Sequence, residues 1–148
     1  MSTKFVDEKN ARPGQYGQVI SDIAQKGVCP LCTEQINNFH NKPIEERVHW
    51  LVTENMYPYP ATKHHVMLVH KVHIEHIADI SPEAWGELHE IIRDETKKRA
   101  ITGGSFVCRF GDTHFTGASV THLHAHIVQS NPEDPAYDKQ KGLQVRLG

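Results

Sequence analysis

The feature that most constrains the fold is a period-two run at residues 120–128. Histidines occupy positions 122, 124 and 126, and the residue after each of them is apolar. Because successive side chains of a β-strand point to opposite faces, the run predicts a half-buried strand with three imidazoles on one face, spaced about 6.6 Å apart. The opposite face suits a hydrophobic core. Three histidines on the polar face of a strand favour a chemical role over a merely solvated surface.

A long amphipathic helix is the second constraint. Ser81 is a good N-cap, Pro82 suits the first turn, and Glu83 complements the positive end of the helix dipole. Apolar side chains then recur at helical spacing until two glycines end the helix, so we expect it at about 81–101. Weaker patterns predict a short N-terminal helix at 17–26 and further strands at 46–54, 64–72, 105–110 and 143–147. Strands grouped around one long helix indicate the α+β class.

The length and charge of the chain limit its organisation and its partners. Its 148 residues suit a single domain, 1–148, with an irregular arm at 1–16 and a tail at 131–148. The formal net charge of −2 lacks the basic excess of nucleic-acid-binding proteins, so we expect no nucleic-acid partner. No apolar stretch is long enough for a signal peptide or a membrane span, which predicts a cytoplasmic protein with no membrane partner.

The three histidines leave two chemical roles open. A His-x-His pair on a strand supplies two ligands to a catalytic metal, and a third residue completes the set. Alternatively, one imidazole attacks phosphorus while its neighbours set its tautomer and stabilise charge. Spacing alone does not separate these roles.

Cys29 and Cys32 form a Cys-x-x-Cys pair, whose spacing suits two thiolates on one zinc ion. A redox pair of the thioredoxin kind would need a βαβ context, which the predicted elements do not offer. Two unrelated buried cysteines are the remaining alternative. The sequence therefore predicts half of a zinc site near residue 30.

His122-x-His124-x-His126, followed by two apolar residues, resembles the signature of the histidine triad (HIT) superfamily. The resemblance covers about 28–130 and implies a HIT-like antiparallel sheet, a homodimer, and a nucleotide hydrolase or nucleotidyl transferase. Its substrate would be a purine or other nucleotide with a phosphoanhydride or phosphoramidate bond. The resemblance further implies that His124 is the nucleophile, forming a nucleotidyl-imidazole intermediate, and that His126 contacts the scissile phosphate and helps to relay a proton.

Zinc-bearing members of the superfamily, and the galactose-1-phosphate uridylyltransferases related to them, complete the zinc site with two histidines. Carried over to this chain, these are His73 and His122, which would join Cys29 and Cys32. A site with four protein ligands is closed, so the resemblance implies a structural zinc ion that fixes the position of the triad.

The segment before the triad is similar to the Gly-x-Ser segment of related proteins, whose hydroxyl and amides face the phosphate. Gly117, Ala118 and Ser119 carry this resemblance. Glycine permits close approach of the backbone to an anion, and the serine hydroxyl is a donor. The resemblance also places a histidine at the start of the strand 64–72, and we expect His65 to hydrogen-bond within the active site.

Nucleotide contacts are expected in the loop that begins at Asn55. Asn-Met-Tyr-Pro resembles the segment that lies against the ribose in the uridylyltransferase-like branch. The carboxamide of Asn55 would contact sugar hydroxyls, and Tyr57 or Tyr59 would border the base. Arg109 has two possible roles, neutralising a phosphate or pairing with Asp112.

Two other functions remain open. A nucleotide-binding regulator with little turnover would share the pocket, although binding alone needs no nucleophile. A metal-dependent hydrolase would instead use His122 and His124 as catalytic zinc ligands. Substitution of the histidines and chelation of zinc discriminate among the three.

Overall fold

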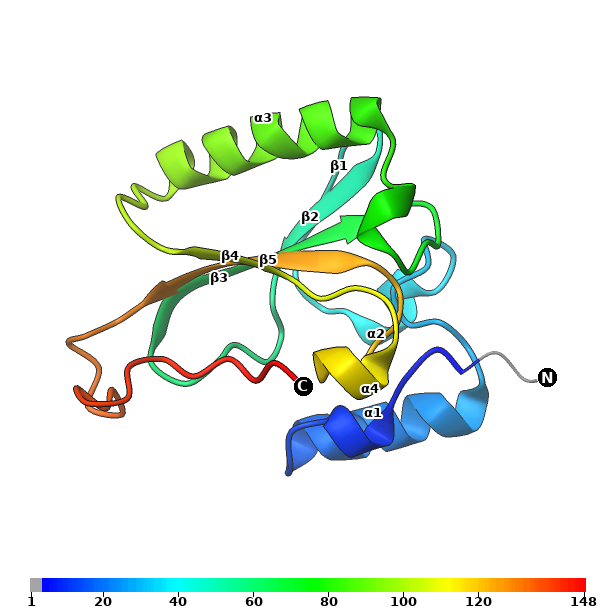
Figure 1. The fold of residues 1–148 in the computed structure, drawn as a ribbon, viewed down its shortest axis with the longest axis horizontal. Coiled ribbons are helices and arrows are strands. Elements are labelled where there is room, and N and C mark those ends of the chain that lie inside the picture. Colours follow the sequence, from blue (N-terminus) through cyan, green and yellow to red (C-terminus); the bar gives the residue numbers. More distant parts are fainter. Residues whose placement is uncertain (1–3) are drawn as a thin grey trace.

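A five-stranded antiparallel sheet forms the centre of the fold (Figure 1). The computed structural model describes residues 4–148, so the part of the predicted arm at 1–3 lies outside the described residues. The strands lie in the order β1-β2-β3-β5-β4. Their bounds are β1 (Ile44–Glu46), β2 (Trp50–Glu54), β3 (Thr62–His70), β4 (Ser105–Cys108) and β5 (His124–Ser130). The predicted α+β class with an antiparallel sheet is confirmed.

Helices cover both faces of this sheet. The long helix α3 lies on one face, and α1 and α4 lie on the other (Figure 1). The bounds are α1 (Gln15–Lys26), α2 (Ile36–Phe39), α3 (Pro82–Lys98) and α4 (Thr113–Thr116), with 3-10 turns η1 (Glu8–Asn10) and η2 (Ile77–Asp79). The short N-terminal helix therefore begins two residues before its predicted start at 17, and Gly27 ends it in the left-handed conformation.

Helix α3 begins as its sequence predicts and ends earlier. The Ser81 hydroxyl accepts a hydrogen bond from the Ala84 amide at 3.1 Å. The helix ends at Lys98 rather than 101, because Ala100 has a φ of 52°, in the left-handed region. Near this end, Arg99 binds the buried Glu95 at 2.8 Å and Glu54 of β2 at 2.9 Å. These ion pairs hold the helix end against the sheet.

The central strand β3 is buried on both of its faces. Val66 and Leu68 belong to the core beneath α3, whereas Met67 and Val69 belong to the core on the α1 side. This explains why the sequence at 64–72 is apolar without alternation, as expected for a strand between two layers. The strand itself spans 62–70.

The other strand predictions need correction. The region 46–54 forms two strands, because the chain turns between them: the Arg47 amide donates to the Trp50 carbonyl at 2.8 Å, and Val48 is 75% exposed. The strand predicted at 105–110 ends at Cys108, and residues 143–147 form no strand. The predicted loop 111–117 contains the short helix α4.

Strand β5 begins at His124 rather than at residue 120. The preceding residues pair with the N-terminal segment instead: Val120 forms a bridge with Val6, and the Thr121 amide donates to the Phe5 carbonyl at 2.9 Å. The chain therefore enters the sheet only after His122, which takes a different orientation from the two histidines that follow. The expectation of three aligned imidazoles on one strand is wrong for the first of them.

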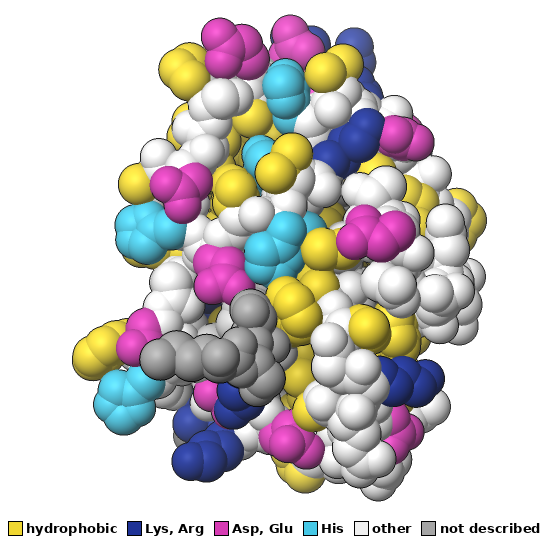
Figure 2. Space-filling model, turned by 90° about the vertical axis from the view of Figure 1, so that its right-hand side faces the viewer, with side chains coloured by type: hydrophobic (Ala, Val, Ile, Leu, Met, Phe, Trp, Pro, Cys, Tyr) yellow, Lys and Arg dark blue, Asp and Glu magenta, His cyan; other side chains and the backbone are white. Residues whose placement is uncertain are grey.

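The surface is mixed in character. On the face shown in Figure 2, acidic, basic and hydrophobic side chains are interspersed over the coloured residues. None of the helices within residues 4–148 combines the length and apolar character that crossing a bilayer requires.

Candidate functional site

Four side chains from three parts of the chain converge into a possible metal site. Cys29 and Cys32 come from the loop after α1, His73 from the loop after β3, and His122 from the residues before β5. One potential ligand atom from each lies within 4.8 Å of all the others. The set is the one that the resemblance predicts, drawn together from positions up to 93 residues apart.

The distances within this cluster fit one tetrahedral ion. With Zn–S at about 2.3 Å and Zn–N at about 2.0–2.1 Å, a tetrahedron has sulfur–nitrogen edges of about 3.6 Å and a nitrogen–nitrogen edge of about 3.3 Å. The Nδ1 atom of His122 lies 3.4 Å from Cys29 Sγ and 3.6 Å from Cys32 Sγ. His73 Nδ1 lies 3.4 Å from Cys32 Sγ and 3.1 Å from His122 Nδ1. The residues present therefore fit a zinc ion.

Hydrogen bonds orient both histidines for ligation through Nδ1. The His122 Nε2–H donates to the backbone carbonyl of His70 at 2.6 Å. The His73 Nε2–H donates a hydrogen bond to a carboxylate oxygen of Glu75 at 3.2 Å. Each bond fixes the tautomer that leaves the lone pair on Nδ1, and such outer partners are typical of histidine ligands of metals.

Burial sets the protonation states of the cluster in the absence of a metal ion. Burial, with the neighbouring Cys29 thiol, raises the pKa of Cys32 to about 12. Burial lowers the pKa of His122 to about 4, and nearby histidines add to the effect. The His122 imidazole is therefore neutral at pH 7 with an available lone pair. Cys32 would lose its proton on binding a metal ion, whose charge would stabilise the thiolate.

His124 lies outside this cluster and faces a cavity. Its Nδ1–H donates to the His122 carbonyl at 2.7 Å, so the lone pair is on Nε2. Burial lowers the pKa of His124, and the charge of Arg109 lowers it further, whereas the hydrogen bond to the His122 carbonyl raises it. At pH 7 the half-buried His124 is thus a neutral imidazole with one bare nitrogen, which is the form required of a nucleophile.

His126 and His65 form a hydrogen-bonded pair beside His124. The Tyr59 amide donates to His65 Nδ1 at 3.2 Å, so the neutral His65 ring carries its proton on Nε2. That proton is donated to His126 Nδ1 at 2.9 Å, which places the proton of His126 on Nε2. Burial is the main cause that lowers the pKa of both rings, to about 4 for His65 and well below the usual value for His126. Both are neutral, and the tautomer of His126 is set by its neighbour.

The segment before the triad is held by contacts with residues near both ends of the sequence. Gly117 has a φ of 70°, and a Cβ built there would lie 3.1 Å from the backbone nitrogen of Gly148, so the position requires glycine. The Asn10 side chain donates to the Ala118 carbonyl at 2.9 Å. The Ser119 hydroxyl is hydrogen-bonded to the Tyr16 hydroxyl. Gly117, Ala118 and Ser119 therefore all line the same cavity as His124.

The loop after β2 reaches the same cavity. The Asn55 carboxamide oxygen accepts from the Tyr57 amide at 2.8 Å, which leaves its NH₂ group to donate. Its nitrogen lies 3.4 Å from His65 Nε2, and since both groups are donors in the tautomer above, this contact is not a hydrogen bond. The Tyr59 ring packs on His65 at 4.5 Å, whereas the Tyr57 ring lies 5.3 Å from that of Tyr16.

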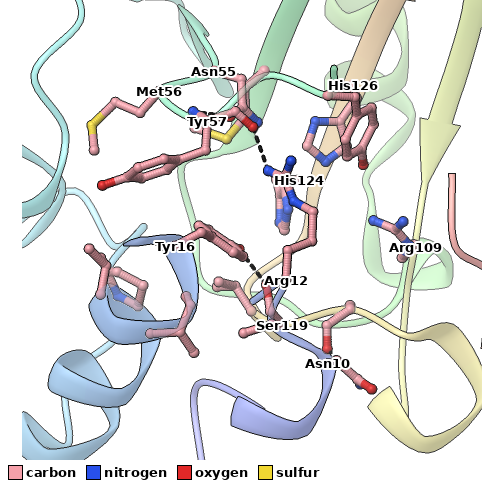
Figure 3. A pocket seen from close by; sticks show the side chains of 18 of the residues that line it. Asn10, Arg12, Tyr16, Asn55, Met56, Tyr57, Arg109, Ser119, His124 and His126 are labelled. Carbon is pink, nitrogen blue, oxygen red and sulfur yellow. Dashed lines mark hydrogen bonds between the residues drawn. The ribbon is translucent and has the colours of Figure 1, made fainter. Parts of the chain in front are cut away.

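The shared cavity has a volume of about 640 Å³. His124 and His126 line it, together with Asn55, Tyr57 and Ser119 (Figure 3). His65 lies behind them, bonded to His126 rather than lining the cavity. Such a volume is typical of a small-molecule site.

Several residues that line the cavity were not predicted from the sequence, among them Arg12, Tyr16 and His40. The first two belong to a segment with no periodic pattern, and their partners lie 45 and 103 residues away. His40 forms a hydrogen bond to Thr53 Oγ1 at 2.7 Å. Arg109 also lines the cavity and donates to the Arg146 carbonyl, at 2.7 and 3.1 Å, rather than to Asp112.

Known structures share this fold at low sequence identity. A "Hit Like Protein" is 23% identical with a TM-score of 0.54, over 65% of this chain and 93% of that chain. A histidine triad nucleotide-binding protein from Candida albicans is 16% identical with a TM-score of 0.58, over 76% and 78%. A Zn-bound histidine triad family protein from Mycobacterium smegmatis is 16% identical with a TM-score of 0.51, over 75% and 79%.

The sequence itself supports the same relationship. No curated protein matches it. A family model described as "Scavenger mRNA decapping enzyme C-term binding", however, matches residues 28–142, well over half of the chain. The matched range contains the Cys-x-x-Cys pair, His65, His73 and all three triad histidines. This match shows that the chain belongs to the family described as "Scavenger mRNA decapping enzyme C-term binding", and its fold is the one seen in histidine triad proteins.

Proposed function

We propose that the protein is a nucleotide hydrolase or nucleotidyl transferase that works through a nucleotidyl-histidine intermediate on His124. The observation that carries this proposal is the hydrogen bond from His124 Nδ1 to the His122 carbonyl. It leaves the nucleophilic lone pair on Nε2 of a neutral ring in a cavity of nucleotide size. The family match to a decapping enzyme supports a reaction at phosphorus.

The reaction has two steps. His124 Nε2 attacks the phosphorus bound to the nucleoside, and the bond to the leaving group breaks as that group departs with the electron pair. His126, whose Nε2–H is free of His65, donates a hydrogen bond to a phosphoryl oxygen, and Ser119 donates a second. Water or a phosphate then attacks the same phosphorus, releases the nucleotide with loss of a proton to solvent, and restores the neutral ring.

We infer that zinc occupies the cluster of Cys29, Cys32, His73 and His122. A zinc ion with four protein ligands supplies structure rather than catalysis, because no position stays open for substrate. It links the loop after α1 to the residue two positions before the nucleophile. Among the described residues the cluster contains His122 and not His124, so the geometry disfavours a hydrolase with both as catalytic ligands. We also propose that the chain is similar to galactose-1-phosphate uridylyltransferase-like proteins. The same four ligands support this proposal.

The nucleoside would occupy the part of the cavity near α1 and the loop after β2. Asn55 has a free NH₂ group for a ribose hydroxyl. Tyr57, Gly117 and Ala118 all line the cavity. Tyr57 would border the base, whereas Gly117 and Ala118 would face the phosphate. The reduced cysteines of the zinc site fit a reducing compartment such as the cytoplasm.

We also propose a homodimer formed through β4. This strand lies at one end of the sheet order, and its Phe106 is 43% exposed. Unpaired strand edges bind other strands through their backbone groups, and an apolar side chain adds buried surface. Light scattering should report twice the mass of the chain, and a monomeric mass at micromolar concentration would contradict the proposal.

Substitution of the nucleophile tests the function. His124→Ala should lower turnover on the order of 10⁴-fold or more, as expected when a covalent nucleophile is lost. The matched control is His114→Ala, because His114 is exposed on α4 and does not line the cavity. A panel of nucleotides, read out by which nucleoside monophosphate appears, supplies the substrate. Normal rates in His124→Ala would eliminate the mechanism, and tight binding without turnover in the native protein would favour the regulatory alternative.

A further inference from the structure

The Ser119 hydroxyl is hydrogen-bonded to the Tyr16 hydroxyl (Figure 3), and neither group has another hydrogen-bond partner within residues 4–148. Tyr16 belongs to α1, which lies outside the range 28–142 that the family model matches. The proposed reaction gives Ser119 one task, to donate a hydrogen bond to a phosphoryl oxygen. Because a hydroxyl has a single proton, the direction of that proton decides whether Ser119 can perform this task.

The backbone around Ser119 is fixed independently of its hydroxyl. The Asp7 amide donates to the Ser119 carbonyl at 2.8 Å, and the Asn10 side chain donates to the Ala118 carbonyl at 2.9 Å. These bonds place the residue in the wall of the cavity, but they leave the hydroxyl proton free to turn. Among the described residues, only Tyr16 contacts the hydroxyl through a hydrogen bond and can orient this proton.

The Tyr16 ring is itself held in position. The Tyr57 ring lies 5.3 Å from it, and the Arg12 guanidinium lies 5.1 Å from its centre. Burial raises the pKa of Tyr16, although the hydrogen bond with Ser119 acts in the opposite direction. The phenol therefore keeps its proton at neutral pH and is available as a donor.

The chemistry of the two hydroxyls decides which of them donates. A phenol is a stronger acid than an alcohol and therefore the better donor, so the Tyr16 O–H donates to Ser119 Oγ. The proton of Ser119 then has no acceptor among the described residues and is left for a ligand. In the opposite arrangement, Ser119 would donate to Tyr16, and the ligand would receive the proton of Tyr16 instead.

We propose that Tyr16 is a positioning residue, whose hydroxyl donates to Ser119 Oγ and so directs the Ser119 proton towards the phosphoryl group that His124 attacks. All three side chains belong to the lining of one cavity. This inference rests on the proposed function and adds α1 to the elements that serve it. Since the phosphoryl oxygens gain charge during the reaction, the effect of Tyr16 should appear in kcat rather than in KM.

A double-mutant cycle on kcat tests the inference. Ser119→Ala should lower kcat about 100-fold, as the loss of one donor to a developing charge does. Tyr16→Phe removes one oxygen atom, fills the same space and should lower kcat about tenfold. The double variant should be no slower than Ser119→Ala, because Tyr16 then has no hydroxyl left to orient. Tyr137→Phe is the matched control, since Tyr137 lies in the tail and does not line the cavity.

A merely structural role of Tyr16 would give different results. Disturbance of α1 would raise KM, because Val19 and Ile20 of this helix also line the cavity. A raised KM with an unchanged kcat in Tyr16→Phe, or additive losses of about 1,000-fold in the double variant, would overturn the inference. A large loss in Tyr16→Phe with none in Ser119→Ala would also overturn it, because Tyr16 would then donate to the ligand itself.

Failure of the inference is distinct from failure of the proposed function. In each result above that overturns the inference, the native protein still turns over its substrate through His124. Absence of turnover by the native protein on every nucleotide of the panel would instead count against the proposed function, and the inference would fall with it.

Discussion

Removal of the His122 imidazole should abolish a zinc-dependent part of the stability. In the native protein, a zinc concentration 1,000 times the Kd stabilises the folded state by about 4 kcal/mol. For a chain of this size, each kcal/mol shifts Tm by about 2–4 °C, so zinc should raise Tm by about 8–16 °C. His122→Ala opens the tetrahedron, and we expect its Tm to be independent of zinc.

The same substitution has a second, zinc-independent cost. The His122 side chain is fully buried and donates to the His70 carbonyl, so its removal leaves a cavity and an unpaired acceptor. Losses of about 2–4 kcal/mol are typical of such truncations. The total loss in the presence of zinc should therefore exceed the loss in the presence of a chelator by the zinc contribution.

Thermal unfolding with and without zinc, combined with metal analysis of the purified protein, measures both parts. His89→Ala is the matched control, because His89 is an exposed histidine on α3. It should retain one zinc per chain and the full zinc-dependent shift. Full zinc content in His122→Ala, or a Tm of the native protein that does not respond to zinc, would refute the assignment of the cluster.

Three further predictions concern the cavity. His65→Ala should lower kcat about 100-fold or more, because His126 loses the hydrogen-bond donor that sets its tautomer. The zinc content should change little. An unchanged kcat would show that His65 has no role in the active site. Burial lowers the pKa of His65 to about 4, whereas the same histidine takes up a proton below about pH 6.5 in the unfolded chain. The contribution of His65 to the free energy of unfolding is therefore complete above pH 6.5, and it falls by up to about 3 kcal/mol as the pH approaches 4. Urea unfolding at pH 6.5 and at pH 4 should show that His65→Gln loses less stability on acidification than the native protein. An equal loss of stability in both proteins would contradict the lowered pKa of His65. Tyr16→Phe should lower the free energy of unfolding by about 1 kcal/mol through loss of the bond to Ser119, and no change in urea unfolding would show that this bond contributes nothing.

Sequence patterns predict the helices and strands that depend on capping and on hydrophobic spacing within one segment. The cap at Ser81 and the apolar spacing after it locate α3, and the two-sided apolar run locates β3. The Cys-x-x-Cys spacing predicts Cys29 and Cys32 as zinc ligands, whereas His73 and His122 as their partners come from a resemblance, and the structure brings the four predicted ligands together. The role of each remains a prediction.

Features that depend on contacts between residues far apart in the chain could not be predicted from the sequence. The start of β5 is set by pairing of residues 119–121 with the N-terminal segment, more than 100 residues away. Arg12 and Tyr16 lie in that same segment, where no periodicity indicates a buried role. Val48 continues the alternation of β2 in sequence, yet it lies in an exposed turn because the chain reverses there between β1 and β2.

The most direct test of the central claim is to trap the intermediate. Native protein is mixed with a substrate identified from the nucleotide panel, quenched at alkaline pH, where a phosphorus–imidazole bond survives, and digested for mass spectrometry. The account predicts a nucleotidyl group on the peptide that contains His124, and none on that peptide in His124→Ala. An adduct on another residue, or rapid turnover of the native protein with no adduct at any time, would contradict it.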